Sequence, residues 1–143
     1  MILLRYLYVV ALVLWVGGLI VAGALVAPSV FGEVLLRLTW LSYAMGGIMF
    51  ITLTLHRLLG ARPVKYGIRV GIMSVMLTMM MVTGFYLIPG VNAIQADVKG
   101  PVAELPDADP RRLEFNRLHG LSNVFFAITA IGGLALCWWE ARE

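Results

Sequence analysis

Residues 6–32 read YLYVVALVLWVGGLIVAGALVAPSVFG, 27 positions without a charged side chain. A helix needs about 20 mostly apolar residues to cross a bilayer, because lipid offers the backbone no hydrogen-bond partner. The run is apolar all round and does not alternate with a period of two, which excludes a transmembrane β-strand. It therefore predicts a membrane-spanning helix.

Three further uncharged runs of this kind follow. Pro89 and Gly90 are expected to end the third helix, because proline and glycine commonly mark helix ends. We predict four spans, near residues 5–30, 36–58, 66–90 and 110–139. The extracytoplasmic loop is expected at residues 91–109. The predicted fold is an all-α integral membrane protein, an antiparallel four-helix bundle that forms one domain over residues 1–143.

The composition agrees with this prediction. Hydrophobic residues make up 61% of the chain and charged residues 13%, with a mean hydropathy of +0.91. A soluble domain carries about 25% charged residues. One cysteine excludes an internal disulfide framework. The net charge of +3 comes from scattered residues without a nucleic-acid motif, so the expected partner is the lipid bilayer and no nucleic acid.

Loop charges predict the orientation. The end of the second span, the loop after it and the start of the third span carry four basic residues and no acid, whereas five acids follow the third span. Basic residues accumulate on the cytoplasmic side of membrane proteins. We therefore expect a multi-pass protein with cytoplasmic N- and C-termini. The basic residues are Arg57, Arg62, Lys65 and Arg69, and the acids are Asp97, Glu104, Asp107, Asp109 and Glu114.

An internal repeat is a second organisational feature. Residues 37–42 and 117–122 share the pattern R-L-x-x-L-S, and each opens a helix that runs in the same direction. Two repeated hairpins are one explanation, and a chance match between leucine-rich spans is the other.

Small residues are expected where the helices approach each other, since close packing drives association in lipid. Asp109 and Pro110 predict the N-cap and first position of the last helix. The small residues are Gly18, Ala22, Gly23, Ala27, Gly46, Gly47, Gly67, Gly71, Ala127, Ala130, Gly132 and Gly133.

The last helix carries the clearest candidate site. Arg112, Asn116, His119 and Asn123 recur at spacings of four, three and four, which places them on one face. We expect that face to point into the mouth of the bundle, because polar groups at membrane depth usually mark a site. His119 is suited to bind metal or haem, or to exchange a proton. A purely structural hydrogen bond to a loop carbonyl is the alternative.

His56 lies at the inner end of the second helix, about 25 Å from His119 across a core of roughly 30 Å. The two therefore cannot both ligate one haem. A haem would need one histidine with Met76, Met80 or a second subunit. Thioethers also suit Cu(I), and methionine equally fills gaps in a core. For His56, an interfacial position beside Arg57 is the simpler interpretation.

No motif for catalysis is present: there is no nucleophile elbow, phosphate loop, HExxH or CxxC. No catalytic residue is assigned, and an enzyme is not expected. The predicted function is a membrane binding or accessory protein, acting as a homo-oligomer or as a subunit of a larger complex. The alternative is a haem b or copper protein that uses His119; a small permease is the third hypothesis.

Two stretches resemble a known family: Trp15-x-Gly17-Gly18 with Pro28-x-x-Phe31-Gly32, and the segment 115–122, F-x-R-x-H-G-L-S. They are similar to small four-span proteins related to transmembrane protein 205. The resemblance implies four spans and a bacterial inner membrane, without an established activity. More distantly, the chain resembles the copper-resistance D and protoporphyrinogen-oxidase J group, whose helix histidines are associated with copper or haem. The family resemblance points to Arg117, His119, Gly120 and Ser122.

Overall fold

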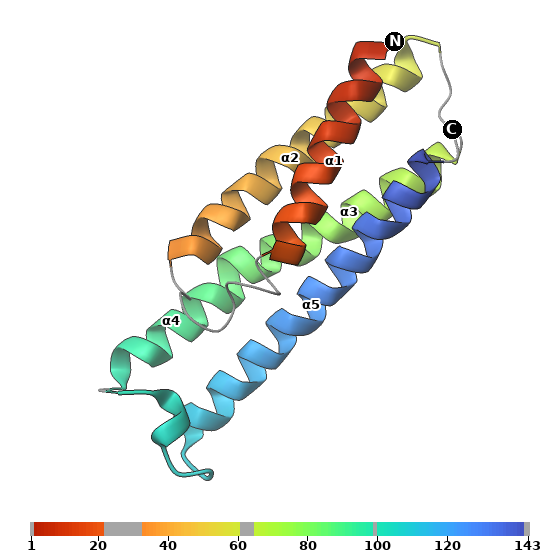
Figure 1. The fold of residues 1–143 in the computed structure, drawn as a ribbon. Helices are drawn as coiled ribbons and strands as arrows, with labels where there is room; N and C mark the ends of the chain where they lie inside the picture. Colours follow the sequence, from red (N-terminus) through yellow and green to blue (C-terminus); the bar gives the residue numbers. More distant parts are fainter. Residues whose placement is uncertain (1, 22–32, 61–64, 99, 142–143) are drawn as a thin grey trace.

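The structure is a computed structural model that describes residues 2–21, 33–60, 65–98 and 100–141. These residues form helices and turns, without a strand among them. The helices form four rods, and the third is continuous through a π-helical turn; Figure 1 shows how the rods lie beside one another. The rods are α1 (Ile2–Val21), α2 (Glu33–Leu58), α3–η2–α4 (Tyr66–Val82, Thr83–Leu87 and Ile88–Asp97) and α5 (Pro110–Glu140). A short 3₁₀ turn, η3 (Val102–Glu104), lies between α4 and α5.

Each rod packs against two others. α1 contacts α2 and α5, and α3 contacts the same two helices. Neighbouring rods run in opposite directions, and α4 with the start of α5 extends beyond the other two helices (Figure 1). The beginning of α1, the end of α2, the beginning of α3 and the end of α5 therefore meet at one end of the molecule.

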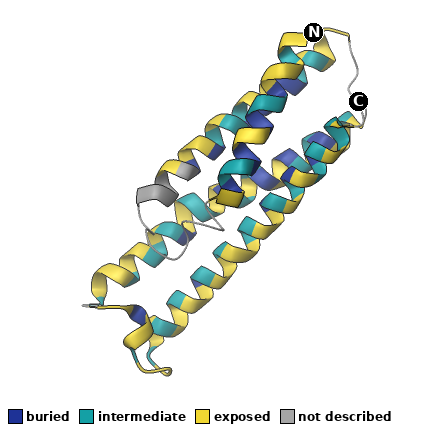
Figure 2. Ribbon diagram, in the orientation of Figure 1, coloured by how far each residue is buried: buried dark blue, intermediate teal, exposed yellow. Residues whose placement is uncertain are grey.

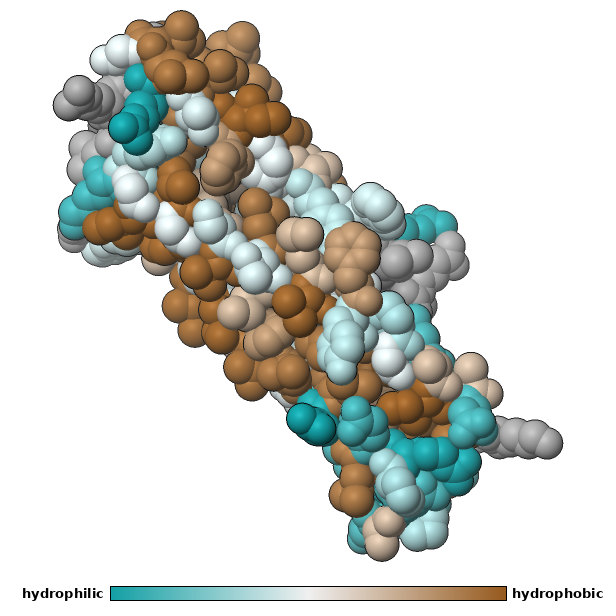
Figure 3. Space-filling model, turned by 180° about the vertical axis from the view of Figure 1, so that it is seen from behind, coloured by the Kyte–Doolittle hydropathy of each residue, from teal (hydrophilic) through white to brown (hydrophobic). Residues whose placement is uncertain are grey.

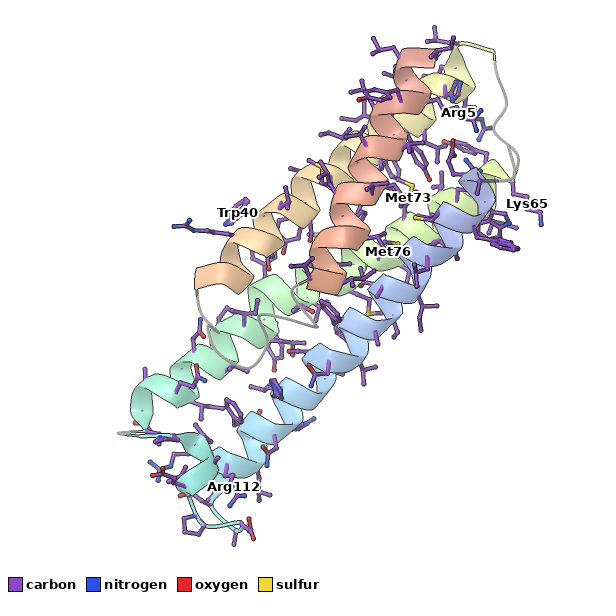
Figure 4. All side chains as sticks on the ribbon, viewed as in Figure 1. Arg5, Trp40, Lys65, Met73, Met76 and Arg112 are labelled. Atoms are coloured by element: carbon purple, nitrogen blue, oxygen red, sulfur yellow. The ribbon has the colours of Figure 1, made fainter. Side chains whose placement is uncertain are left out.

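The core lies between the rods in the half nearest that end (Figure 2). α1 buries Tyr8, Leu12, Trp15 and Leu19, at spacings of four, three and four. Met49 from α2, Leu136 from α5, and Met73, Met76 and Met80 from α3 join them. Figure 4 shows Met73 and Met76 pointing between the helices. The methionines fill the irregular space where helices cross, as flexible thioether side chains commonly do.

Glycines permit part of this close packing. Gly46 of α2 lies against Trp15 of α1, and Gly133 of α5 also faces α1, so that a side chain at either position would collide. These contacts confirm two of the predicted small-residue positions. Gly132 of α5 likewise lies close to Met76 of α3, whereas the prediction was wrong for Gly47, Gly67 and Gly71, which have no described side chain nearby. Ala22, Gly23 and Ala27 lie outside the described residues.

The predicted helix end at Pro89 and Gly90 was wrong, because the helix continues to Asp97. Proline lacks an amide hydrogen, and its ring collides with the carbonyl four residues earlier. Here the carbonyl four residues before Pro89 belongs to Phe85, within the wider π-helical turn Thr83–Leu87, which leaves room for the ring. The predicted loop 91–109 is accordingly shorter, with helix over its first seven residues.

The π-helical turn is in contact with α2. The Tyr43 hydroxyl donates a hydrogen bond of 3.1 Å to the main-chain carbonyl of Met80. The Tyr43 ring also stacks on Phe85, with 6.0 Å between ring centroids. Gly84 allows this approach, because a Cβ there would collide with Tyr43.

The predicted start of the last helix is confirmed. Asp109 caps α5, accepting a hydrogen bond of 2.9 Å from the amide of Arg111, and Pro110 occupies the first helical position. Among the described residues, three helices are long and apolar enough to cross a membrane: Ile2–Val21, Tyr66–Asp97 and Pro110–Glu140. The fourth predicted span, in α2, stays a prediction.

Candidate functional site

Three charged residues meet where the rods begin and end. Glu140 of α5 accepts hydrogen bonds from Arg5 Nε of α1 at 2.8 Å and from Arg69 Nη1 of α3 at 3.0 Å. Arg5 Nη2 also reaches the main-chain carbonyl of Glu140, at 3.4 Å. We call Arg5, Arg69 and Glu140 the charged cluster; it joins three helices.

Burial makes the charged cluster unusual. The side chain of Arg69 is 2% exposed and that of Glu140 is 10% exposed. A buried ion is stable only when a countercharge and hydrogen bonds replace the water that it loses. Arg69 lies on the same face of α3 as the core residues Met73 and Met76, and its buried guanidinium pairs with the Glu140 carboxylate at the end of the core.

A small recess opens beside the charged cluster. It has room for about one water molecule, and the roughly 230 Å³ of empty space around it include open solvent. All four rods contribute to its wall, with polar groups from Arg5, Tyr8, Thr52, His56, Arg69 and Glu140. The accessible polar groups of the recess are those of Arg5 and His56, because the Thr52 hydroxyl donates within its own helix and the Tyr8 hydroxyl and the Arg69 side chain are buried.

Further basic residues surround this end. The Arg57 guanidinium lies 4.4 Å above the ring of Tyr66, and the Lys65 ammonium lies 5.7 Å from the ring of Trp139. Figure 4 shows Arg5 and Lys65 at the same end, opposite Arg112. We call Arg57 and Lys65 the basic rim. Both side chains are held by aromatic rings, outside the recess.

The predicted site on α5 divides into separate parts. Arg112 binds the main-chain carbonyl of Leu105 and pairs with Asp107, so it holds the turn before α5. Ser122 donates to the carbonyl of Leu118 within its own helix. The ring of His119 stacks on that of Phe115 with 5.8 Å between centroids.

The expectation that this polar face points into the mouth of the bundle was wrong. Asn116 and Asn123 are exposed, and so is Arg117 beside them. The face of α5 that packs inward carries Thr129 and Leu136 instead. The polar residues share one face of α5, as their spacing predicts, but a different, more apolar face of this helix packs against its neighbours.

The candidate metal or haem ligands do not come together. His56 lines the recess near Glu140, whereas His119 lies about 30 Å away along α5, from the rise of 1.5 Å per residue. Met76 and Met80 are buried in the apolar core. Among the described residues, no three histidine, cysteine or acidic side chains gather around one point.

Sequence reasoning missed the charged cluster, although a signal was present. In the sequence analysis, Arg69 counts only among the basic residues that predict orientation, yet its spacing of four and seven from Met73 and Met76 puts it on the same helix face as these residues. An arginine on such a face requires an acidic partner. In the structure, Glu140 at the end of α5 is the acidic residue that pairs with Arg69.

No family model, curated protein or solved structure matches this chain. The function of the charged cluster and of the polar face of α5 is therefore inferred from the residues at each end of the molecule.

Proposed function

We propose that this protein is an integral membrane protein, an antiparallel four-helix bundle that binds other molecules as an accessory subunit. The supporting observation is the band of exposed apolar side chains on the outward faces of the helices. Large examples are Val13, Ile51, Phe85, Ile131 and Leu134. Figure 3 shows hydrophobic residues along most of the molecule, hydrophilic residues gathered at its lower end, and a smaller hydrophilic group beside hydrophobic residues at the upper end. Such a band is stable against lipid and unfavourable in water.

Helix lengths are consistent with this placement. α1 has 20 residues, or about 30 Å, which is the thickness of the hydrocarbon core. The rod Tyr66–Asp97 has 32 residues and therefore measures about 48 Å. The excess length of this rod and of α5 projects from one side and carries the acidic turn.

In the proposed orientation, the end with Arg5 and the basic rim is cytoplasmic. The opposite end holds the acids near the start of α5, so the charge difference follows the positive-inside tendency. The family resemblance favours a bacterial inner membrane. We also propose that the chain is related to the small four-span proteins that resemble transmembrane protein 205.

The accessory role is supported by the exposed polar face of α5. Asn116, Arg117 and Asn123 lie on it next to His119, and they are available to a partner helix or to a second copy of the chain. Hydrogen bonds between such groups stabilise helix association in membranes. The proposal therefore predicts a homo-oligomer or a larger membrane complex.

Membrane insertion is tested by alkaline carbonate extraction and cysteine labelling in a Cys137→Ala background. Lys65→Cys and Glu104→Cys place thiols at exposed positions of opposite ends. An impermeant maleimide should label Glu104→Cys in intact spheroplasts, and Lys65→Cys only after permeabilisation. Release by carbonate, or equal labelling of both variants, would contradict the proposal.

The accessory role is tested by a photo-crosslinking amino acid at Asn123, with Leu134 on an apolar exposed position of the same helix as the control. We expect a discrete crosslinked species from position 123 and little from position 134. A protein that is monomeric in nanodiscs and forms no adduct at position 123 would argue against an accessory role.

A further inference from the structure

The outward face of α5 carries two carboxamides, those of Asn116 and Asn123. Both side chains are exposed, and neither has a hydrogen-bond partner among the described residues. Gly120 and Ala127 are exposed as well and lie on the same face as Asn123, three residues before it and four after it. We propose that this face binds the same face of a second copy of the chain, in a parallel contact where the two helices cross at Asn123.

The depth of Asn123 in the membrane makes a partner necessary. This inference rests on the proposed membrane insertion, in which Trp139, with Lys65 beside its ring, lies at the cytoplasmic head-group level. Residues 124–139 carry no amide or charged side chain and measure about 24 Å, which is less than the roughly 30 Å of the hydrocarbon core. Asn123 therefore faces hydrocarbon, where lipid offers its carboxamide no hydrogen-bond partner.

A second copy matches Asn123 in both depth and chemistry. Copies of the chain insert in one orientation, so a two-fold axis along the membrane normal places Asn123 of each copy at the same depth. A carboxamide carries N–H donors and a carbonyl acceptor, so its partial charges are complementary to those of another carboxamide. Two asparagines can thus form a reciprocal pair of hydrogen bonds, whereas an unrelated helix would need a polar group at this one depth.

Side-chain size determines where the two helices cross. Gly120 and Ala127 leave the backbone accessible on either side of Asn123, and small residues permit close helix approach in lipid. Towards the cytoplasmic end, the outward face carries Ile131 and Leu134, which are 68% and 53% exposed. Their bulk keeps the helices apart, so the helices diverge from the crossing and Leu134 lies outside the contact.

Cysteine crosslinking in a Cys137→Ala background tests this geometry. Ala127→Cys places a thiol on the proposed contact. Ile128→Cys is the matched control, because this exposed position has almost the same depth but points about 100° away around the helix. Oxidation by copper–phenanthroline in native membranes should join two copies through position 127 and leave the protein with a thiol at position 128 monomeric.

Energy transfer between donor-labelled and acceptor-labelled copies in liposomes measures the role of the carboxamide. Both variants Asn123→Leu and Asn116→Leu change an exposed residue, so neither disturbs the core. We expect Asn123→Leu to weaken dimerisation about tenfold, within the range for interhelical hydrogen bonds in model peptides. Asn116→Leu removes the same group about 10 Å nearer the outer water. Water competes for hydrogen bonds there, and dimerisation should change less than threefold.

A third variant, Ala127→Ile, adds bulk at the crossing and should abolish energy transfer. Its side chain is exposed in the single chain, so the fold has room for the larger residue. Circular dichroism of the variant in liposomes checks that the helices remain. Loss of transfer with the helical signal intact supports the close contact, and unchanged transfer contradicts it.

The outcomes separate this inference from the proposed function. Crosslinking at position 127 alone, together with weaker dimerisation in Asn123→Leu, supports the parallel contact. Equal crosslinking at positions 127 and 128, or equal effects of Asn123→Leu and Asn116→Leu, overturns it. A monomeric protein that forms an adduct with another protein from position 123 overturns only this inference, whereas release of the protein from membranes by carbonate contradicts the proposed function too.

Discussion

Arg69 of α3 and Glu140 of α5 are 71 positions apart in the chain, yet Arg69 Nη1 lies 3.0 Å from Glu140 Oε2. The pair is almost fully buried, and Arg5 of α1 binds the second carboxylate oxygen. One carboxylate thus joins three helices at one end of the molecule.

Glu140→Gln should destabilise the fold strongly. Arg69 would keep its charge in a buried site without a countercharge, a loss of about 3–5 kcal/mol for a broken buried pair. Thermal unfolding in detergent, followed by circular dichroism, measures the effect. Glu114→Gln is the matched control, because Glu114 is exposed on the same helix, and we expect a change within about 0.5 kcal/mol. Equal stability of the two variants would refute the structural role of Glu140.

Gly46→Val should disturb the contact between three helices. A side chain at position 46 would meet the rigid ring of Trp15 and the end of Leu77, and overpacking of a core costs about 1–3 kcal/mol. The control Gly71→Ala adds a methyl group where no described atom is near. It should leave stability unchanged or raise it by up to about 1 kcal/mol, because alanine is the better helix former. The same unfolding assay compares them, and a neutral Gly46→Val would contradict the packing.

Tyr43→Phe removes the hydroxyl that donates to the Met80 carbonyl before the π-helical turn. We expect a loss of about 1 kcal/mol, the usual contribution of one hydrogen bond. Hydrogen exchange should also become faster across residues 83–88. Tyr86→Phe provides the comparison, since the Tyr86 ring is 68% exposed on the same turn. Identical exchange in both variants would show that the Tyr43 hydroxyl does not hold the turn.

Asp109 predicts a pH dependence at the start of α5. Hydrogen bonds from Arg111 lower the pKa of the Asp109 carboxyl below its ordinary value of 3.8. Because the folded-state pKa is depressed, the carboxylate stabilises the helix start above the ordinary pKa, and this is lost as the pH falls through the folded value. Protection factors of the first amides of α5 should therefore decrease below about pH 4.

Asp109→Asn tests that prediction, because it keeps a capping oxygen and removes the titrating group. Protection at the start of α5 should then vary little with pH. An unchanged pH dependence in this variant would assign the effect to another group.

The candidate site was predictable only in part. The spacing of Asn116 and Asn123 indicates a shared face on α5, and the structure places both on its exposed side. Periodicity groups residues by face, but it does not decide which face turns inward when both carry small or apolar neighbours. The face with Thr129 and Leu136 is the one that packs, and the polar residues consequently face outward.

Pro89 illustrates the same limit for a helix end. A proline is locally unfavourable inside a helix, yet the π-helical turn before it, held against α2 through Tyr43, lets the rod continue to Asp97. A contact with another helix overrode the local preference.

The sequence by itself determined the helical elements, their apolar character and the cap at Asp109, because hydrophobic runs and capping groups act within a few neighbouring residues. Only the tertiary structure decided that Arg69 meets Glu140 and that the recess forms beside them. That meeting depends on the relative rotation and register of separate helices, which close contacts such as Gly46 on Trp15 select. No interaction local to one helix specifies them.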